Sequence, residues 1–581
     1  MKLSMMNACS SGVRAAHGGN AERRRYIKRA AVVALGILVL TALMLSQSNQ
    51  PLRPLSDLIP ASPLIYVEAR DLGAALKEWN GSKVKADWVA SPNYKAFAQS
   101  RLFMRLDLAQ TEYAAAAGFA PDMPFVEAVA GANSALALYD IGELQFLYIT
   151  RMPQARAYQS MLWQSRAKFQ PRRAGGIDYY VRQQQGRRAV FAVTNDLLLI
   201  ATDEQAMAGA LELIAGQTRP RMRDESWYQS SAAAQPQSGD FRMVHNFARV
   251  VKTPYFRSYW VQRNSRELDQ FTAFISDLDR SAAEFRERRV LLRDDAAADL
   301  RPAEAGVGEL LRFVPADAGL YRAWARPSLD TAAAFIIEKS SGRGATAQGQ
   351  QRYAPAAENP DVSAGSEQDI EVRVDEPQLR DDVRTADAGA LRTLLNGNAV
   401  QAMLEVQTAQ AGADGVFIGT PGAIALLGER AWNAAAARSA VAAMVSAGWT
   451  VGGIGAGWTG QNVQTLTGLR KVAIAVSDRV LIVGNAEAVV AAMIARTGAQ
   501  QGGAAYAARF QHARELPKFE RMMRLIDAPA LRGSTGDNRE PLFFSENLAS
   551  LGRALGRVGD VSIESHDDGR AVRQTVVYRL Q

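Results

Sequence analysis

The sequence has 581 residues, of which 48% are hydrophobic, and a formal net charge of +8. This length predicts two to four domains, and the hydrophobic content is sufficient for folded cores. Seven basic residues and one acidic residue lie within 1–29, so the rest of the chain carries only +2, which argues against a nucleic-acid-binding body. The single cysteine, Cys9, lies in the same tail and excludes a disulfide framework or thiolate metal site in the body.

An apolar segment follows this basic tail. Residues 30–45 are apolar apart from Gly36 and Thr41 and would span roughly 24 Å as a helix. We therefore expect a cytoplasmic tail at 1–29, an uncleaved transmembrane signal anchor at 30–46 and a linker at 47–58. A cleaved signal peptide and a buried core helix are the alternatives. The expected product is a single-pass protein of the inner (cytoplasmic) membrane, with its bulk periplasmic or otherwise extracytoplasmic.

Beyond the linker, four sequence blocks recur in the same order, which predicts an internal repeat. The matched blocks are 59–72 with 314–329, 130–140 with 418–428, 187–207 with 470–490, and 285–293 with 571–579. We expect a first α+β unit at 59–293, a linker at 294–313 and a second α+β unit at 314–581. Chance similarity is the alternative. Because short turns join the expected strands, the sheets should be largely antiparallel, with helices packed on them.

The second unit differs from the first by an extra segment. Residues 340–368 are poor in apolar side chains and rich in Gly, Ala, Gln and Ser. Such a composition cannot bury enough apolar surface to offset the entropy of ordering. We expect a disordered insertion there.

One glycine motif has the spacing of a dinucleotide-binding turn. Gly455, Gly457 and Gly460 form G-x-G-x-x-G. A dinucleotide site needs a helix directly after the glycines, whose N-terminus faces the pyrophosphate. Here the following residues predict a turn and a strand, so we interpret the glycines as structural.

The remaining candidate chemistry is weak. Beyond the tail the chain has three histidines: His245, His512 and His566. Their spacing fits no zinc motif, and His245 lies in a strand-like run, where a structural role is expected. Ser82 and Lys85 form an S-x-x-K motif without the partner motifs of an acyl-transfer site. We expect the charge run 276–289 to be an exposed turn or helix face, and we predict no catalytic, cofactor-binding or metal-ligating residue.

Two segments resemble a known kind of protein. With "LIPASPLIYVEARDL" (58–72) and "AVFAVTNDLLLIAT" (189–202), the chain resembles uncharacterised bacterial membrane-anchored envelope proteins with an exported domain of unknown function. The resemblance implies one N-terminal span and offers no catalytic residue. We expect a non-enzymatic binding or scaffold role, with another envelope protein, a lipid or a glycan as partner and no nucleic acid. An envelope hydrolase with a site between the two units is the alternative.

Overall fold

A computed structural model describes most of the chain. The described residues are 53–91, 94, 97–98, 101–184, 186–253, 268–341, 388–412, 418–449, 457–467, 471–496, 502–519 and 556–581. Residues Leu55–Gln581 form one compact unit, which contains both predicted α+β units. The predicted tail at 1–29 and all but the first two residues of the insertion at 340–368 lie outside the described residues.

The transmembrane helix is the part of the expected fold that has to be corrected. Within the described ranges, no helix is long and apolar enough to cross a membrane. The longest helix there, α5 (Arg101–Ala117), has 17 residues and includes Asp107 and Glu112, which would be costly to place in lipid. The predicted anchor at 30–46 lies outside the described residues. The α+β class holds, but the fold is a large antiparallel sheet with helices and no described membrane span.

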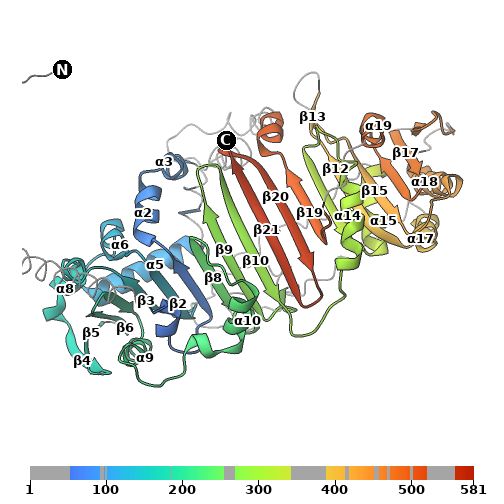
Figure 1. Ribbon diagram of the computed structural model, residues 1–581. Coiled ribbons are helices and arrows are strands. Elements are labelled where there is room, and N and C mark those ends of the chain that lie inside the picture. Colours follow the sequence, from blue (N-terminus) through green and yellow to red (C-terminus); the bar gives the residue numbers. More distant parts are fainter. Residues whose placement is uncertain are drawn as a thin grey trace, which may run out of the picture. The chain divides into compact units, whose positions relative to one another are not determined.

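Within the described ranges, the first half of the compact unit (residues 55–293) contributes ten strands to this sheet, and the second half is residues 294–581. They are β1 (Ile65–Ala69), β2 (Ser134–Asp140), β3 (Gln145–Arg151), β4 (Gln170–Ala174), β5 (Ile177–Gln184), β6 (Arg187–Thr194), β7 (Leu197–Ala201), β8 (Phe241–Asn246), β9 (Ala273–Arg280) and β10 (Glu284–Leu292). Their order across the sheet is β4-β5-β6-β7-β3-β2-β1-β8-β9-β10, and every pair is antiparallel. Figure 1 shows β8, β9 and β10 lying side by side.

The second half contributes nine strands. They are β11 (Leu320–Ala325), β12 (Val400–Gln407), β15 (Gly422–Gly428), β16 (Gln464–Thr467), β17 (Lys471–Ser477), β18 (Val480–Gly484), β19 (Tyr506–Phe510), β20 (Val558–Asp567) and β21 (Ala571–Leu580). Their order is β16-β17-β18-β15-β12-β11-β19-β20-β21, and β21 pairs with β10 to make one 19-stranded sheet. β13 (Gln410–Ala411) and β14 (Ile418–Gly419) form a separate small hairpin. Apart from β4, the strand orders of the two halves correspond strand for strand.

The strand register of the two halves also agrees. The match of 187–207 with 470–490 places Ala201 opposite Gly484. Stepping from these residues across paired strands leads to Tyr66 in β1 and Tyr321 in β11, which are the tyrosines of the separately matched blocks 59–72 and 314–329. The steps are Ala201–Leu147–Ala137–Tyr66 in the first half and Gly484–Ala423–Val406–Tyr321 in the second. These two sequence blocks therefore share a single register.

The other two sequence blocks need correction. The block 130–140 contains β2, whereas 418–428 contains β15, whose counterpart by strand order is β3. Stepping onward from Tyr66 and Tyr321 reaches Val290 and Val577, which are 287 residues apart. The match of 285–293 with 571–579 implies 286, so it is wrong by one residue. A slip of one residue turns every side chain of a strand to the opposite face.

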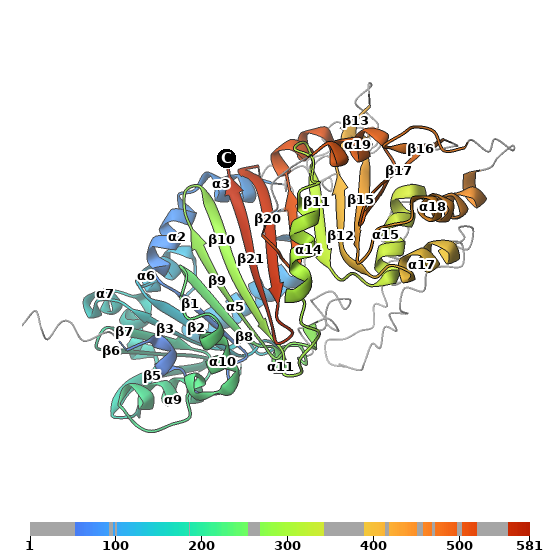
Figure 2. The ribbon, with the colours of Figure 1, turned by 45° about the vertical axis from the view of Figure 1, so that its right-hand side comes forward.

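In the described part of the chain, fourteen α-helices accompany the sheet. Their bounds are α2 (Leu72–Asn80), α3 (Lys83–Val89), α5, α6 (Met123–Val129), α7 (Gln154–Tyr158), α8 (Met161–Gln164), α9 (Glu204–Ile214), α10 (Ser226–Ala234), α11 (Phe247–Val250), α14 (Arg301–Leu311), α15 (Leu329–Ser341), α17 (Ala388–Asn396), α18 (Ala434–Trp449) and α19 (Glu487–Ala495), with 3-10 turns η1 (Leu55–Leu58), η2 (Arg166–Lys168) and η3 (Met222–Asp224). Two predicted linkers hold ordered elements: η1 is buried within 47–58, and α14 lies within 294–313 with Val307 and Leu310 in the core. Figure 2 shows α14 lying over β11 and β12.

Different helices cover the two faces of the sheet. In β6, alternate residues pack toward α9 and toward α5, and in the matched β17 they pack toward α19 and toward α18. The residues toward α9 and α19 are Val190, Ala192, Ala473 and Ala475, and those on the opposite face are Ala189, Phe191, Val472 and Ile474. Helices α9 and α19 therefore cover corresponding faces of corresponding strands. This arrangement positions the candidate site described next.

Candidate functional site

The second half contains a cavity of about 510 Å³ beside the start of α19, which we call the α19 pocket. It is bounded by α19, the end of β12, the turn before β11 and the helical residues 512–519. The lining residues are Pro315, Asp317, Ala318, Val406, Thr408, Ala409, Gln410, Pro421, Ala486, Ala488, Val489, Ala492, Arg514 and Lys518. Small apolar side chains thus form most of the wall, and its volume is in the range of small-molecule sites.

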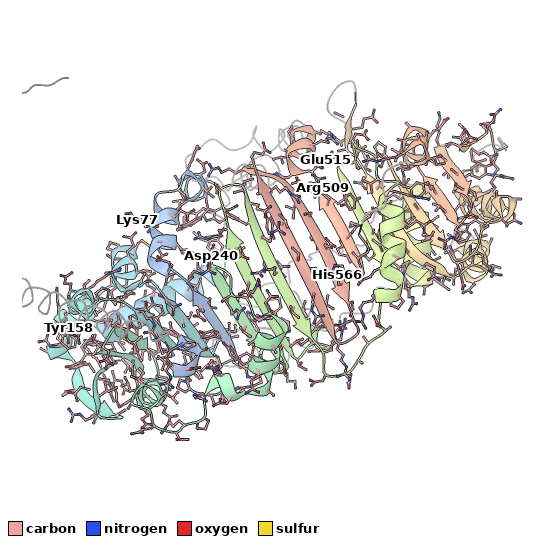
Figure 3. All side chains as sticks on the ribbon, viewed as in Figure 1. Lys77, Tyr158, Asp240, Arg509, Glu515 and His566 are labelled. Carbon is pink, nitrogen blue, oxygen red and sulfur yellow. The ribbon has the colours of Figure 1, made fainter. Side chains whose placement is uncertain are left out.

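A buried carboxylate lies beneath this wall. Glu515, labelled in Figure 3, is 5% exposed, and its Oε2 accepts a 2.7 Å hydrogen bond from the Ala409 amide. Its Oε1 accepts from Lys518 Nζ at 2.8 Å, and Lys518 also donates to Ala409 O. A Cβ at Gly319 would clash with the Glu515 carboxyl group, so a larger residue there would displace this side chain from its hydrogen bonds. The charge of Lys518 is therefore balanced within the protein.

Arg514 is the other cation of the α19 pocket. Its Nη1 donates to Ala316 O at 3.3 Å, and among the described residues no carboxylate lies within ion-pair distance of its guanidinium. Asp317 also lines the pocket but makes no ion pair with Arg514 in the described part of the chain. Arg514 is exposed, so its positive charge is available at the rim of the cavity.

The first half has the same backbone arrangement at the start of α9. Thr202 Oγ1 accepts from Phe146 N at 3.0 Å and donates to Leu144 O at 2.9 Å. At the matched place before α19, Asn485 Oδ1 accepts from Gly422 N at 2.8 Å, and its Nδ2 donates to Thr420 O at 3.3 Å. Different side chains therefore hold equivalent backbone groups in the two halves.

The residue that follows Thr202 and Asn485 differs in chemistry between the two halves. Asp203 is the N-cap of α9, and its side chain accepts a 2.9 Å hydrogen bond from Ala206 N. The matched N-cap of α19 is Ala486, which has no side-chain acceptor for the matched Val489 amide. The gapless match of 187–207 with 470–490 already places Asp203 opposite Ala486. That difference is the signal by which the sequence could have indicated the α19 pocket, which sequence reasoning missed.

The first half also fills the corresponding space with its own residues. Tyr139, two residues beyond Ala137 in β2, donates to Pro60 O at 3.0 Å, whereas the second half has Thr408 two residues beyond Val406. Burial raises the pKa of Tyr139, and the nearby Glu225 and Asp203 carboxylates raise it further.

In the first half, a longer segment between α9 and β8 covers the position that corresponds to the α19 pocket. Pro220 O accepts from Ala61 N at 3.1 Å, and Ile59 O accepts from Met222 N at 3.0 Å. The second half has only residues 496–505 between α19 and β19, whereas the first half has residues 215–240 between α9 and β8. The turn at 59–62 is thus covered, while its counterpart before β11 lines a cavity.

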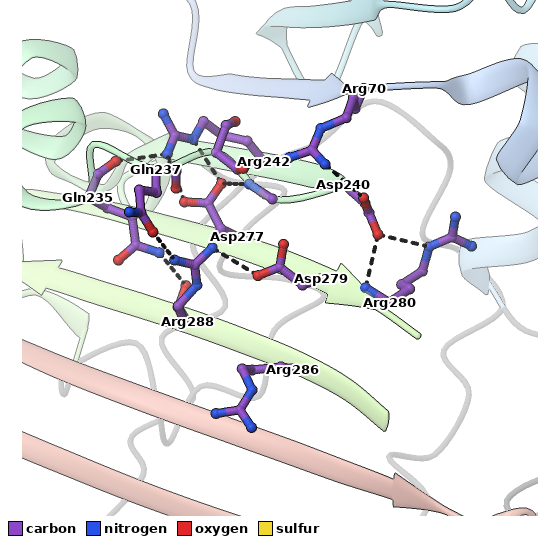
Figure 4. Close-up of polar contacts among 12 residues, drawn as sticks. Arg70, Gln235, Gln237, Asp240, Arg242, Asp277, Asp279, Arg280, Arg286 and Arg288 are labelled. Atoms are coloured by element: carbon purple, nitrogen blue, oxygen red, sulfur yellow. Dashed lines mark hydrogen bonds and ion pairs between the residues drawn. The ribbon is translucent and has the colours of Figure 1, made fainter. Parts of the chain in front are cut away.

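A buried charge network lies in the first half, on the face of the sheet that α9 covers (Figure 4). Asp277 is fully buried and accepts from Arg242 Nε and Nη2, both at 2.8 Å, and from Gly239 N at 3.0 Å. Arg242 Nη2 also donates to the carbonyl oxygens of Gln235 and Gln237, each at 2.8 Å. These bonds fix the segment after α10 against the sheet, which is a structural role.

The charge run 276–289 differs from the expected exposed turn or helix face. It forms most of β9 and β10 and the turn between them, with Asp277 buried. At the end of β10, Arg293 donates to both carboxylate oxygens of Asp567 at 2.8 and 3.0 Å, which links the two halves. Alternating charged residues favour a strand when every second one finds a partner on the sheet face.

The three histidines occupy separate environments. His245 lies in β8 between the rings of Phe247 and Phe274, and neither ring nitrogen has a hydrogen-bond partner among the described residues. Burial lowers the pKa of His245 to about 4. His566 Nδ1 lies 2.9 Å from Glu304 Oε2, and the ring of His512 contacts Phe510. Within the described ranges, no group of three or more His, Cys, Asp or Glu side chains could hold a metal ion.

The S-x-x-K and glycine motifs have local structural explanations. Ser82 is the N-cap of α3, and its Oγ accepts from Lys85 N at 3.1 Å. Gly460 has a φ of +101°, and a Cβ there would lie 2.3 Å from Val463 O. The strand β16 follows it, as predicted, whereas Gly455 lies outside the described residues.

Comparison with known proteins adds little. No family model and no curated protein match the chain. Among solved structures, crystal form III of TP0453 shares 10% identity over 45% of this chain and 87% of that chain, with a TM-score of 0.24. Crystal form I of TP0453 shares 10% identity over 43% of this chain and 82% of that chain, with a TM-score of 0.23. At such scores the likeness supports no conclusion about fold or function.

Proposed function

We propose that the chain is a non-enzymatic binding protein built from two copies of one α+β unit, and that the second copy binds a small molecule in the α19 pocket. One observation carries this proposal. The first half fills the corresponding space with Tyr139 and the segment 220–225, whereas the second half leaves a cavity of about 510 Å³. A copy that binds a ligand at this position must lack the side chains that fill it in the other copy.

Descent of the two halves from one unit is supported by agreement at three levels. The strand orders correspond, and the register connects the block at Ala201 with the block at Tyr66. Thr202 and Asn485 make equivalent backbone hydrogen bonds with different chemical groups. Chance similarity between unrelated segments would not preserve such a detail across a sheet.

The ionisable groups at the pocket suit binding better than catalysis. Lys518 and Glu515 neutralise each other, and Glu515 is held by the Ala409 amide. A guanidinium does not serve as a proton-transfer group, so Arg514 suits attraction of an anion and not acid-base chemistry on a substrate. Location in the cell envelope, and a protein, lipid or glycan partner, stay predictions.

Ligand screening by thermal shift tests the proposal on the full chain. The compounds are 3-phenylpropionate, phenyl phosphate, 3-phenylpropanol and 3-phenylpropylamine, which share an apolar body and differ in their polar group. Ala492→Trp fills the pocket, and Ala435→Trp on the exposed side of α18 is the matched control. At least one compound should raise the melting temperature of the wild type and of Ala435→Trp but not of Ala492→Trp. Failure of all four compounds, or a shift that survives Ala492→Trp, would contradict the proposal.

A further inference from the structure

We infer that the ligand of the α19 pocket is a small organic carboxylate with an apolar body, whose carboxylate takes the position that Asp203 occupies in the first half. This inference rests on the proposed function and specifies its ligand. Three features of the two halves support it: a missing carboxylate, a missing ring and an unbalanced cation.

The missing carboxylate is at the start of α19. In the first half, Asp203 Oδ2 accepts from Ala206 N at 2.9 Å. The matched residues of the second half are Ala486 and Val489, and both line the pocket. Ala486 has no side-chain acceptor for the Val489 amide. A carboxylate bound in the pocket would restore the hydrogen bond that the first half makes within its own chain.

The missing ring defines the body of the ligand. Tyr139 of the first half packs against the core and donates to Pro60 O, whereas the corresponding position of the second half holds the small Thr408. The other walls there are Ala318, Ala488 and Ala492. An apolar group of about the size of a phenyl ring would therefore be in contact with apolar side chains.

The unbalanced cation favours a single negative charge. Arg514 donates to Ala316 O, and its first-half counterpart Arg249 donates to Ser62 O at 3.0 Å. In the first half, Glu225 Oε2 accepts from the amide of the same Ser62 at 2.9 Å, and both Glu225 and Asp203 lie near Tyr139. A bound monoanion would supply the second half with that charge, and Asp317 at the same wall disfavours a dianion such as phosphate.

Calorimetric titration of the full chain with three probes that share a phenyl ring tests the inference. 3-Phenylpropionate should bind roughly tenfold or more tightly than 3-phenylpropanol and phenyl phosphate. Ala486→Asp places the capping carboxylate of the first half in the second. It should abolish 3-phenylpropionate binding while raising the melting temperature of the protein, because α19 gains its cap. Arg514→Gln should weaken binding severalfold, whereas the matched Arg249→Gln should leave it unchanged.

The outcomes separate the inference from the proposed function. If the alcohol or the phosphate binds as tightly as the acid, and Ala492→Trp removes that binding, the pocket binds a ligand but the carboxylate assignment is wrong. If Ala486→Asp folds with an unchanged or higher melting temperature and still binds 3-phenylpropionate, the assignment is wrong as well. If no probe binds in a manner sensitive to Ala492→Trp, the proposed function itself fails.

Discussion

Asp277 shows how much a single buried charge can matter in this sheet. Its carboxylate is fully buried and receives three hydrogen bonds, two of them from Arg242. Asp277→Ala should lower the free energy of unfolding by about 3–5 kcal/mol, because it leaves the Arg242 charge buried without its partner. Asp279→Ala is the matched control. Its carboxylate is 41% exposed beside Arg288, so the loss should stay under about 1 kcal/mol. Urea unfolding measures both values, and equal losses would contradict this account.

His245 makes stability depend on pH. Burial lowers the pKa of its imidazole to about 4 in the folded state, whereas the unfolded chain has the ordinary value of about 6.5. The unfolded state therefore takes up the proton first as the pH falls. Stability that is present above pH 6.5 is progressively lost toward pH 4, by about 2–3 kcal/mol.

The measurement compares the wild type with His245→Phe in urea at pH 8 and at pH 5. Phenylalanine suits the aromatic surroundings of Phe247 and Phe274 and has no ring nitrogens to leave unpaired. The variant should gain stability relative to the wild type as the pH falls, since carboxylates titrate equally in both proteins. A difference that does not change with pH would show that His245 does not carry this dependence.

β4 is a strand at the edge of the sheet, and its sequence protects that edge. Pro171 cannot donate a backbone hydrogen bond, and Arg172 and Arg173 are exposed, with Arg173 paired to Asp178. Replacing both arginines with valine should cause the protein to associate through β4. Sedimentation velocity should detect larger species for this double variant but not for Arg573→Val, which changes an exposed residue of an interior strand. Monomer in both cases would mean that the arginines do not guard the edge.

How well each element could be predicted from the sequence depended on how distinctive its pattern was. The block 187–207 contains a strand, a turn, a strand and a capped helix, and this combination admits a single alignment with 470–490. The block 130–140 contains one short apolar strand, which resembles any buried strand, and it was matched to β15 in place of β12. The charges of β10 predict an exposed turn or helix face, which is wrong. The neighbouring strands that supply their partners lie far away in the sequence, so the segment alone does not reveal a strand.

The two halves meet at β10 and β21, where Arg288 lies opposite Thr575. By strand order and register these two residues occupy matching positions, 287 apart, so this pair sets a position against its own counterpart. Two identical copies would place arginine against arginine there. Thr575→Arg should therefore destabilise the protein by about 0.5–1 kcal/mol.

This loss should shrink in concentrated salt, because screening weakens repulsion between partly exposed charges. The neutral control Thr575→Gln tests for size alone. Urea unfolding at low and high sodium chloride concentration distinguishes the two. A loss of the same size for both variants, independent of salt, would indicate packing at the junction and not charge.

The whole-molecule arrangement could be predicted only in part. A repeated α+β unit with antiparallel strands follows from local patterns, whereas the joining of both units into one sheet depends on pairs such as Arg289 with Gln574, which no local pattern reveals. The α19 pocket results from residues that differ between the two halves, so it is recognised only when the first half is compared with the second. The transmembrane helix is an expectation from the apolar run at 30–45 and the basic residues before it, and it has no counterpart among the described helices.

The pairing of β10 with β21 also has a consequence for how the protein is made. Arg289 pairs with Gln574, which the ribosome adds to the chain 285 residues later. At typical elongation rates of 5–20 residues per second, β10 is an open strand edge for roughly 15–60 s on the ribosome. Five of its nine residues are charged: Glu284, Arg286, Glu287, Arg288 and Arg289. Charged side chains disfavour pairing between exposed strand edges, so the charges of β10 suit an edge that stays unpaired until its own partner strand is synthesised.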